Sequence, residues 1–318
     1  MADNTLATGA PTPMKIRVNR GWKKFLRDRW LLLMMVPGII YYVVFKFLPM
    51  YGVIIAFKKF NVYLGILKSP WVGFKHFVNF FNAPYFWQLI RNTMLINIYS
   101  LVFTFPMPII LAIAFNEIYR ARLKKPLQSI TFLPHFISTV VVTSLVLRFL
   151  APTSGIVNKL LGYIGVEPVS FLTDPKYFRS IYIIMEVWKG VGWSSILFIA
   201  ALSRIDTALY EAAVVDGSSK LQQQWYITLP SIIPTIVIML ILRVGHLLDL
   251  GAQTIILLYN PMIYETADVL STFVYRRGIV NADFSYAAAV DLFTSVIGFV
   301  LIISSNKISK MVTDSGLW

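Results

Sequence analysis

Six long apolar stretches dominate the chain. They cover residues 30–57, 92–116, 127–151, 180–203, 231–259 and 286–306. A helix that crosses a bilayer needs about 20 mostly apolar residues at a rise of about 1.5 Å per residue, and each stretch meets that requirement. The pattern predicts an all-α, polytopic membrane protein with six transmembrane helices between residues 30 and 306. Prolines within these stretches, such as Pro106 and Pro134, predict kinks whose freed backbone groups are satisfied inside a helix bundle.

The flanks of this domain have a different character. Residues 1–14 are small and polar, so they predict a disordered tail. Residues 15–29 carry seven basic side chains with aromatic residues between them, which is typical of a helix lying on anionic lipid headgroups. Residues 307–318 form a short C-terminal tail. With six spans, both tails lie on the same side of the membrane.

Composition supports a membrane protein and excludes several other classes. The chain is 57% hydrophobic and 14% charged, with a mean hydropathy of +0.67, whereas soluble proteins average about 45–50% apolar and about 25% charged residues. The net charge of +14 reflects basic loops rather than a nucleic-acid surface. The loop 117–126 holds four basic residues, so the positive-inside rule places it and both termini in the cytoplasm. With no cysteine, disulfides and thiolate chemistry are excluded.

The loop 204–230 is the segment most informative about function. It is far longer than the about 2–8 residues that join neighbouring helices in a bundle. Its pattern predicts two short helices around a turn at Asp216-Gly217, where glycine favours a positive φ. Leu229-Pro230 is predicted to end the second helix, because the residue before a proline avoids the helical region. A plain polar connection between two spans is the structural alternative.

The register of this loop resembles a known family. Glu211-Ala212-Ala213, Gly217 and Ile227-Thr228-Leu229-Pro230 reproduce the EAA motif of type I ABC importer permeases. The resemblance implies a coupling helix that docks on a separate ATP-binding subunit. It implies that Glu211 pairs there with a basic group, that Asp216 and Gly217 form the turn, and that Leu229 and Pro230 redirect the chain into the next span.

The resemblance extends over most of the chain and narrows the branch. The segments 45–60, 70–77, 133–142 and 188–193, together with the final Gly316-Leu317-Trp318, look like the LplB-like, polysaccharide-type sugar permeases. This implies an importer subunit for oligosaccharides from complex polysaccharides, located in a bacterial cell membrane. The implied partners are a second, different permease, two ATP-binding subunits and an extracytoplasmic solute-binding protein. The chain has no phosphate-binding Gly-x4-Gly-Lys-Ser/Thr motif, so ATP and Mg²⁺ are expected on the partner and no cofactor here.

Ionisable residues inside the spans are candidates for the substrate pathway, because their insertion costs about 2.5–3.5 kcal/mol each. Glu186 and Lys189 lie three residues apart, and Arg243 and Asp249 occupy one helical stripe. Ion pairs that hold the bundle together explain the same pattern. Sugar-binding side chains are expected among residues with aromatic faces or amides, namely Trp188, Trp193, Tyr99, Asn97 and Gln253. An excess of buried cations would suit an oligosaccharide that carries uronates.

Two other classes of protein compete with the importer. A secondary carrier usually has more spans built as repeats, with its own ion-coupling site, and neither is visible. A membrane enzyme, or another protein without transport activity, would need a catalytic constellation, and the histidines are scattered. Co-purification with an ATPase would separate the importer from both.

Overall fold

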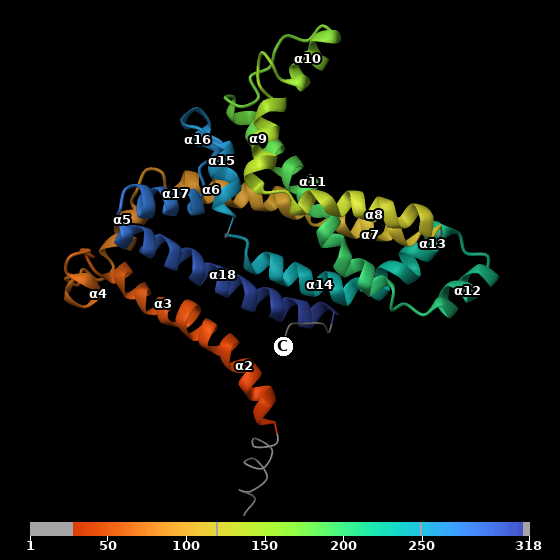
Figure 1. The fold of residues 1–318 in the computed structure, drawn as a ribbon, viewed down its shortest axis with the longest axis horizontal. Helices are drawn as coiled ribbons and strands as arrows, with labels where there is room; N and C mark the ends of the chain where they lie inside the picture. The colour runs from red at the N-terminus through yellow and green to blue at the C-terminus, as the bar shows by residue number, and fades with distance from the viewer. Residues whose placement is uncertain (1–27, 119, 249, 314–318) are drawn as a thin grey trace, which may run out of the picture. The chain divides into compact units, whose positions relative to one another are not determined.

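The computed structural model describes residues 28–118, 120–248 and 250–313 (Figure 1). The predicted tail 1–14, almost all of the basic segment 15–29 and the end of the C-terminal tail lie outside the described residues. Within those residues the chain is almost entirely helical, and an isolated β-bridge joins Lys58 and Trp71. The predicted all-α class is confirmed.

Among the described residues, five helices are long and apolar enough to cross a membrane, and a bent pair makes a sixth. The five cover Arg29–Phe57, Phe86–Asn116, Pro175–Leu202, Lys220–Gly245 and Phe284–Met311. The bent pair consists of α8 (Ala121–Phe136) and α9 (Thr139–Phe149).

Most of the long helical segments are composites. The first joins α2 (Arg29–Tyr42), η1 (Val43–Phe47), α3 (Leu48–Met50) and η2 (Tyr51–Phe57). The second joins α6 (Phe86–Tyr99), η3 (Ser100–Thr104) and α7 (Pro106–Asn116), and the third, α11 (Pro175–Leu202), is uninterrupted. The fourth joins α13 (Lys220–Gln223), η4 (Gln224–Thr228) and α14 (Leu229–Gly245), and the last is α18 (Phe284–Thr313). The shorter elements are α4 (Gly65–Lys68), α5 (Lys75–Phe81), α10 (Ile156–Tyr163), α12 (Thr207–Val215), α15 (Ala252–Leu258), η5 (Pro261–Ile263), α16 (Tyr264–Ala267), α17 (Leu270–Tyr275) and η6 (Arg276–Val280).

Two of the stretches predicted as single spans differ from the structure. The stretch 127–151 is bent by 96° between α8 and α9, because Ile137 and Ser138 have extended backbones with ψ of 132° and 138°. The stretch 231–259 is a helix that ends at Gly245, followed by the separate helix α15. Hydropathy does not separate α14 from α15, because both are apolar. In α15 the apolar residues Ile255 and Leu258 are buried inside the protein.

Three wide π-helical turns each lie just before a proline. They are η1 before Pro49, η3 before Pro106 and η4 before Pro230. A proline ring clashes with the carbonyl four residues earlier, and a π turn moves that carbonyl away. The helices therefore continue through these prolines. The prediction that Leu229-Pro230 ends a helix is wrong, since both residues open α14 within one continuous helical segment.

The described residues divide into two compact units, with the boundary between residues 53 and 54. The described part of the first unit is helical, and none of its residues in α2, η1 or α3 is buried. The second unit contains the core.

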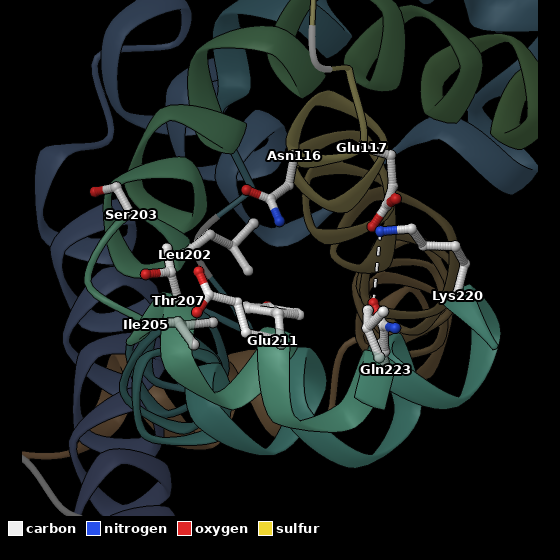
Figure 2. A pocket seen from close by; sticks show the side chains of 11 residues that line it. Asn116, Glu117, Leu202, Ser203, Ile205, Thr207, Glu211, Lys220 and Gln223 are labelled. Carbon is white, nitrogen blue, oxygen red and sulfur yellow. Dashed lines mark hydrogen bonds between the residues drawn. The ribbon is translucent and has the colours of Figure 1, made fainter. Parts of the chain in front are cut away.

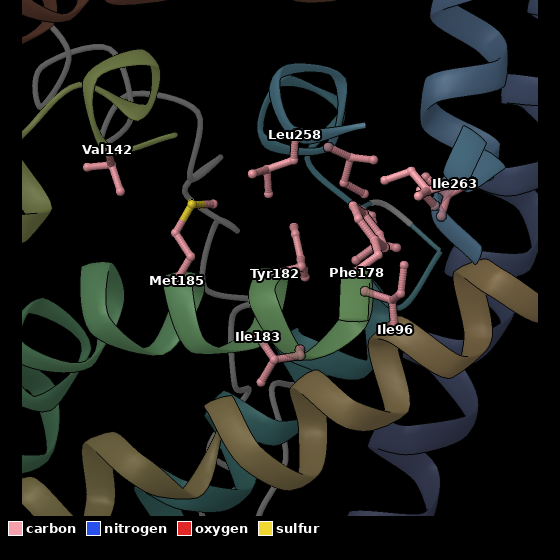
Figure 3. Packing of buried hydrophobic residues seen from close by; sticks show 12 residues of the cluster. Ile96, Val142, Phe178, Tyr182, Ile183, Met185, Leu258 and Ile263 are labelled. Carbon is pink, nitrogen blue, oxygen red and sulfur yellow. The ribbon is translucent and has the colours of Figure 1, made fainter. Parts of the chain in front are cut away.

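Helix α11 organises the core of the second unit. It packs against α7, α8, α14 and α16, and Figure 3 shows Phe178, Tyr182 and Met185 of α11 among buried residues from other helices. At Gly192, a Cβ atom would collide with the backbone carbonyl of Thr131 in α8, so this close helix contact requires glycine. A further cluster of Ala112, Phe198, Leu202 and Ile232 lies where α7, α11 and α14 meet.

Candidate functional site

Helix α12 begins and ends with specific caps. The Asp206 carboxylate accepts a hydrogen bond from the Ala208 amide at 3.0 Å, which satisfies one of the free donors at the first turn. At the other end, the Ser218 amide donates to the Ala213 carbonyl at 2.8 Å and the Gly217 amide donates to the Val214 carbonyl at 3.1 Å. This pair of bonds is a Schellman motif. It needs a left-handed residue, and Gly217 has a φ of 77°, as the Asp-Gly dipeptide predicted.

The second arm of the segment begins directly after this turn. Ser219 and Gln222 form a capping box, in which the Ser219 amide donates to Gln222 Oε1 at 2.7 Å. Helix α13 then continues through η4 into α14 without a break. Movement of this arm is therefore movement of the membrane-crossing helix that follows it.

Side chains tie the two arms together. The Tyr210 hydroxyl and Thr228 Oγ1 share a hydrogen bond at 2.8 Å between α12 and η4. The Gln223 amide donates to the Ser218 carbonyl at 3.1 Å. Thr228 and Gln223 are buried, whereas α12 itself has no buried residue. The segment 206–228 is thus a braced hairpin whose first helix lies outside the core. We call this hairpin the coupling segment.

A cavity of about 570 Å³ lies between the coupling segment and the ends of α7 and α11. Figure 2 shows Glu211 from α12 on one side, and the Glu117 carboxylate and the Lys220 ammonium group pointing toward one another on the other. Lys220 donates to Gln223 Oε1 at 3.5 Å. The cavity therefore has polar and charged walls on the coupling segment and apolar contributions from Leu202 and Ile205.

The predicted motif residues occupy distinct parts of this hairpin. Glu211, Ala212 and Ala213 lie on α12, Asp216 and Gly217 form its end, Ile227 lies in η4, and Leu229 and Pro230 open α14. The same hairpin exposes large apolar side chains, with Val215 87% exposed and Tyr226 79% exposed. Large exposed apolar side chains on a charged hairpin are candidates for contact with a partner.

Three of the predicted pathway residues come together inside the spans. Glu186 lies near Lys189, Arg243 and the Thr254 side chain of α15. Lys189 donates to the Thr139 hydroxyl of α9. Arg243 of α14 donates to the Ser100 hydroxyl at the start of η3. This charged cluster connects five helical elements, and the hydroxyl partners were not predicted, because neutral hydroxyls carry no signal in an apolar stretch.

The other pathway candidates are dispersed. Asn97 is buried and donates to the Thr93 carbonyl of its own helix at 2.8 Å, a structural role. The Trp193 ring stacks on His135 with centroids 4.7 Å apart. Tyr99 and Trp188 line a second cavity between α6, η3, α7 and α11. Gln253 is exposed at the start of α15. Asp249 lies outside the described residues.

A polar network around α16, α17 and η6 was not predicted from the sequence. Arg276 forms a bidentate ion pair with Asp268, at 3.1 and 2.5 Å. Burial alone would lower the pKa of Arg276, but hydrogen bonding and attraction to Asp268 raise it above its ordinary value. The pair therefore keeps its charges and fixes this loop. Its residues lie between predicted spans, where charged side chains are common and do not indicate a special role.

Together, the membrane-crossing helices and the braced hairpin between α11 and α14 define a membrane permease. Comparison with known proteins gives the family. The chain belongs to the binding-protein-dependent transport system inner membrane components, whose family pattern matches residues 104–313.

Relatives in Bacillus subtilis (strain 168) resemble the chain over nearly its full length. Protein LplB is 43% identical over 92% of both chains. The polygalacturonan/rhamnogalacturonan transport system permease protein YteP is 40% identical over 93% of this chain and 92% of its own.

Solved structures agree with the relatives. A chain of a bacterial ABC transporter involved in the import of the acidic polysaccharide alginate has a TM-score of 0.86 and 44% identity, covering 93% of this chain and 100% of its own. A chain of a bacterial alginate ABC transporter in complex with an alginate pentasaccharide-bound periplasmic protein also has a TM-score of 0.86. This protein is therefore the permease subunit of an ABC importer. It is not an enzyme, and ATP hydrolysis belongs to a separate subunit. The secondary-carrier and membrane-enzyme alternatives gain no support.

Proposed function

We propose that this permease imports oligosaccharides from acidic polysaccharides and that its coupling segment docks on an ATP-binding subunit. The observation that carries the docking is the hairpin 206–228, which is capped at both arms, braced by Tyr210 and Thr228, and continuous with α14. A partner that displaces α12 would move a membrane-crossing helix directly.

The negative charge on Glu211 favours a partner surface with a basic group. Its side chain is exposed on α12 and borders the cavity beside the hairpin. A basic group of the ATP-binding subunit would pair with Glu211, while Val215, Trp225 and Tyr226 supply apolar contact area. Asp216 and Gly217 keep these groups in register by ending α12.

The remaining assembly follows from this assignment. Two ATP-binding subunits would act on two permeases, this chain and a second, different one, and a solute-binding protein would deliver the sugar. The basic loop 117–126 favours an orientation with both termini in the cytoplasm. The coupling segment is then cytoplasmic, where ATP is available. ATP and Mg²⁺ would be bound by the partner.

The proposed pathway passes the charged cluster of Glu186, Lys189 and Arg243. Charges are retained inside a membrane domain when they contact one another, water or substrate. The acidic character of the substrate is supported by the transport names of the YteP and alginate relatives.

Docking is tested by charge reversal. In the full importer, Glu211→Lys should lower the amount of ATP-binding subunit that co-purifies with the permease. Glu167→Lys is a matched control, because Glu167 is also an exposed glutamate and lies in the loop after α10. Equal retention of the ATPase by wild type and Glu211→Lys would contradict the docking.

Substrate class is tested in proteoliposomes containing the importer and its solute-binding protein. Trigalacturonate or a mannuronate trimer should stimulate ATP hydrolysis and be taken up. Stimulation by the neutral trisaccharide maltotriose but by neither uronate would contradict the proposed substrate.

A further inference from the structure

A groove between α11 and the composite helix α6–η3–α7 has a graded chemistry. Its volume of about 730 Å³ lies within the range of about 300–1,000 Å³ typical of small-molecule sites. On α11 the lining runs from Lys176, Arg179 and Ser180 to Trp188 and Val191. The opposite wall presents Tyr99, Phe103 and Met107. The groove is cationic at one end, aromatic along its length and apolar at the other end.

Arg179 is held in place from behind. Its Nη2 donates to Asn92 Oδ1 at 3.2 Å. Asn92 is fully buried at 0% exposure, and its own amide donates to the carbonyls of Glu265 and Asp268 at 2.8 and 3.0 Å. The orientation of the guanidinium group is therefore fixed by a buried amide.

The same guanidinium group retains unused hydrogen-bonding capacity. Arg179 Nε is buried and has no hydrogen-bond partner in the part of the chain that the structure describes. Unpartnered donors on a cation are unfavourable, so a carboxylate that reaches the guanidinium group from the groove is favoured. Lys176 is already paired with Asp174 at 2.9 Å, which leaves Arg179 as the group available to an anion.

The wall composition selects the kind of anion. Among the described residues that line the groove there is no Asp or Glu to repel a carboxylate. A planar carboxylate matches the two-pronged donor geometry of a guanidinium group. The aromatic faces of Tyr99 and Trp188, 38% and 48% exposed, can stack on the apolar faces of sugar rings. A phosphate would use the cation but not the aromatic walls.

We propose that this groove is a subsite for a uronate residue, in which Arg179 binds the carboxylate and Tyr99 and Trp188 contact the sugar rings. The proposal rests on the proposed function, because it presumes an acidic oligosaccharide as the transported substrate. Asn92 acts as a positioning residue for Arg179. An apolar helix of the second permease or a lipid chain would fill the groove without using the guanidinium group, so the experiment has to separate these occupants.

Because the chain has no cysteine, one introduced thiol reports on the groove. Ser180→Cys places it beside Arg179, and Ser154→Cys places a control thiol in an exposed loop outside the groove. The importer in nanodiscs is treated with a water-soluble methanethiosulfonate reagent, with and without trigalacturonate. Trigalacturonate should slow modification of the thiol at position 180 and leave modification at position 154 unchanged. Its carboxyl-reduced, neutral counterpart should not protect position 180.

Variants of Arg179 then test the assigned contact. With Arg179→Gln, half-protection should need about tenfold more trigalacturonate, since one charge-assisted contact is lost, whereas Arg179→Lys should retain part of the protection. A thiol at position 180 that reacts with no reagent would mean that another helix or lipid fills the groove, and the proposal would be wrong. It would also be wrong if the neutral sugar protects equally well. If the importer transports trigalacturonate while the thiol at position 180 stays unprotected, the subsite fails and the proposed function stands, whereas absence of transport defeats the function itself.

Discussion

Substitution of Gly217 by valine should uncouple this permease from its ATPase while leaving membrane insertion intact. Gly217 has a φ of 77°, and a Cβ built there meets no atom within 4 Å. The penalty is therefore conformational rather than steric. A β-branched residue forced into this region costs about 1–3 kcal/mol.

This conformational cost acts on helix α12, which has little stability of its own. Helix α12 has nine residues and buries none of them, and isolated helices shorter than about 12–15 residues are marginal in water. A cost of about 2 kcal/mol changes the population of the closed turn by about thirtyfold. The core clusters do not include Gly217, so the fold of the spans should persist.

The assay measures three quantities on the same preparation: permease in the membrane, ATP-binding subunit retained on the permease, and uptake of trigalacturonate. We expect normal permease levels, with retention and uptake both reduced at least tenfold. Gly217→Asn should retain most activity, because asparagine tolerates the left-handed region. Gly165→Val is the matched control, since Gly165 has a φ of 80° and equally open space, and it should leave ATPase retention unchanged.

The reasoning is refuted if Gly217→Val retains the ATPase and transports normally. It is also refuted if Gly165→Val lowers ATPase retention as much, because the effect would then come from strain anywhere in the chain rather than from the coupling segment.

Three further predictions follow from other parts of the molecule. A cysteine at Arg122 should resist a membrane-impermeant reagent in intact cells, and a cysteine at Glu167 should react, with the reverse pattern contradicting the proposed orientation. Lys189→Gln should leave the complex assembled while uptake falls, and normal uptake would remove Lys189 from the pathway. Arg276→Gln should destabilise the protein by about 3 kcal/mol in thermal or denaturant unfolding, the lower end for breaking a buried pair, because the Arg276 side chain is 26% exposed. Arg276→Gln combined with Asp268→Asn should recover part of this loss, and a double variant no more stable than the single one would argue against the pair.

The sequence predicted what depends on local pattern. Apolar length located the membrane helices, because a bilayer imposes the same requirement on each of them. The Asp216-Gly217 pair predicted a turn with positive φ, because few residues other than glycine adopt that conformation readily. The second short helix after this turn was also predicted from local pattern, and its cap at Ser219 acts within one turn.

The predictions that were wrong concern features that depend on tertiary contacts. Pro230 was predicted to stop a helix, but the π turn η4 lets the helix pass through it. The apolar run after Gly245 is buried against the rest of the protein instead of extending a span, and hydropathy does not distinguish these environments. The Arg179 contact to Asn92 joins residues 87 positions apart. Arg179 also lies one residue before the predicted span 180–203, outside the stretches searched for pathway residues.

A crosslinking measurement tests the coupling segment most directly. Val215 is 87% exposed at the end of α12, and Leu67 is 76% exposed in a different loop. Each is replaced by cysteine in the cysteine-free chain and labelled with a short photoactivated crosslinker in the assembled importer. We expect the residue 215 label to form an adduct with the ATP-binding subunit and the residue 67 label to form none. An ATPase adduct from residue 67, or its absence from residue 215 in an importer that hydrolyses ATP, would contradict the account.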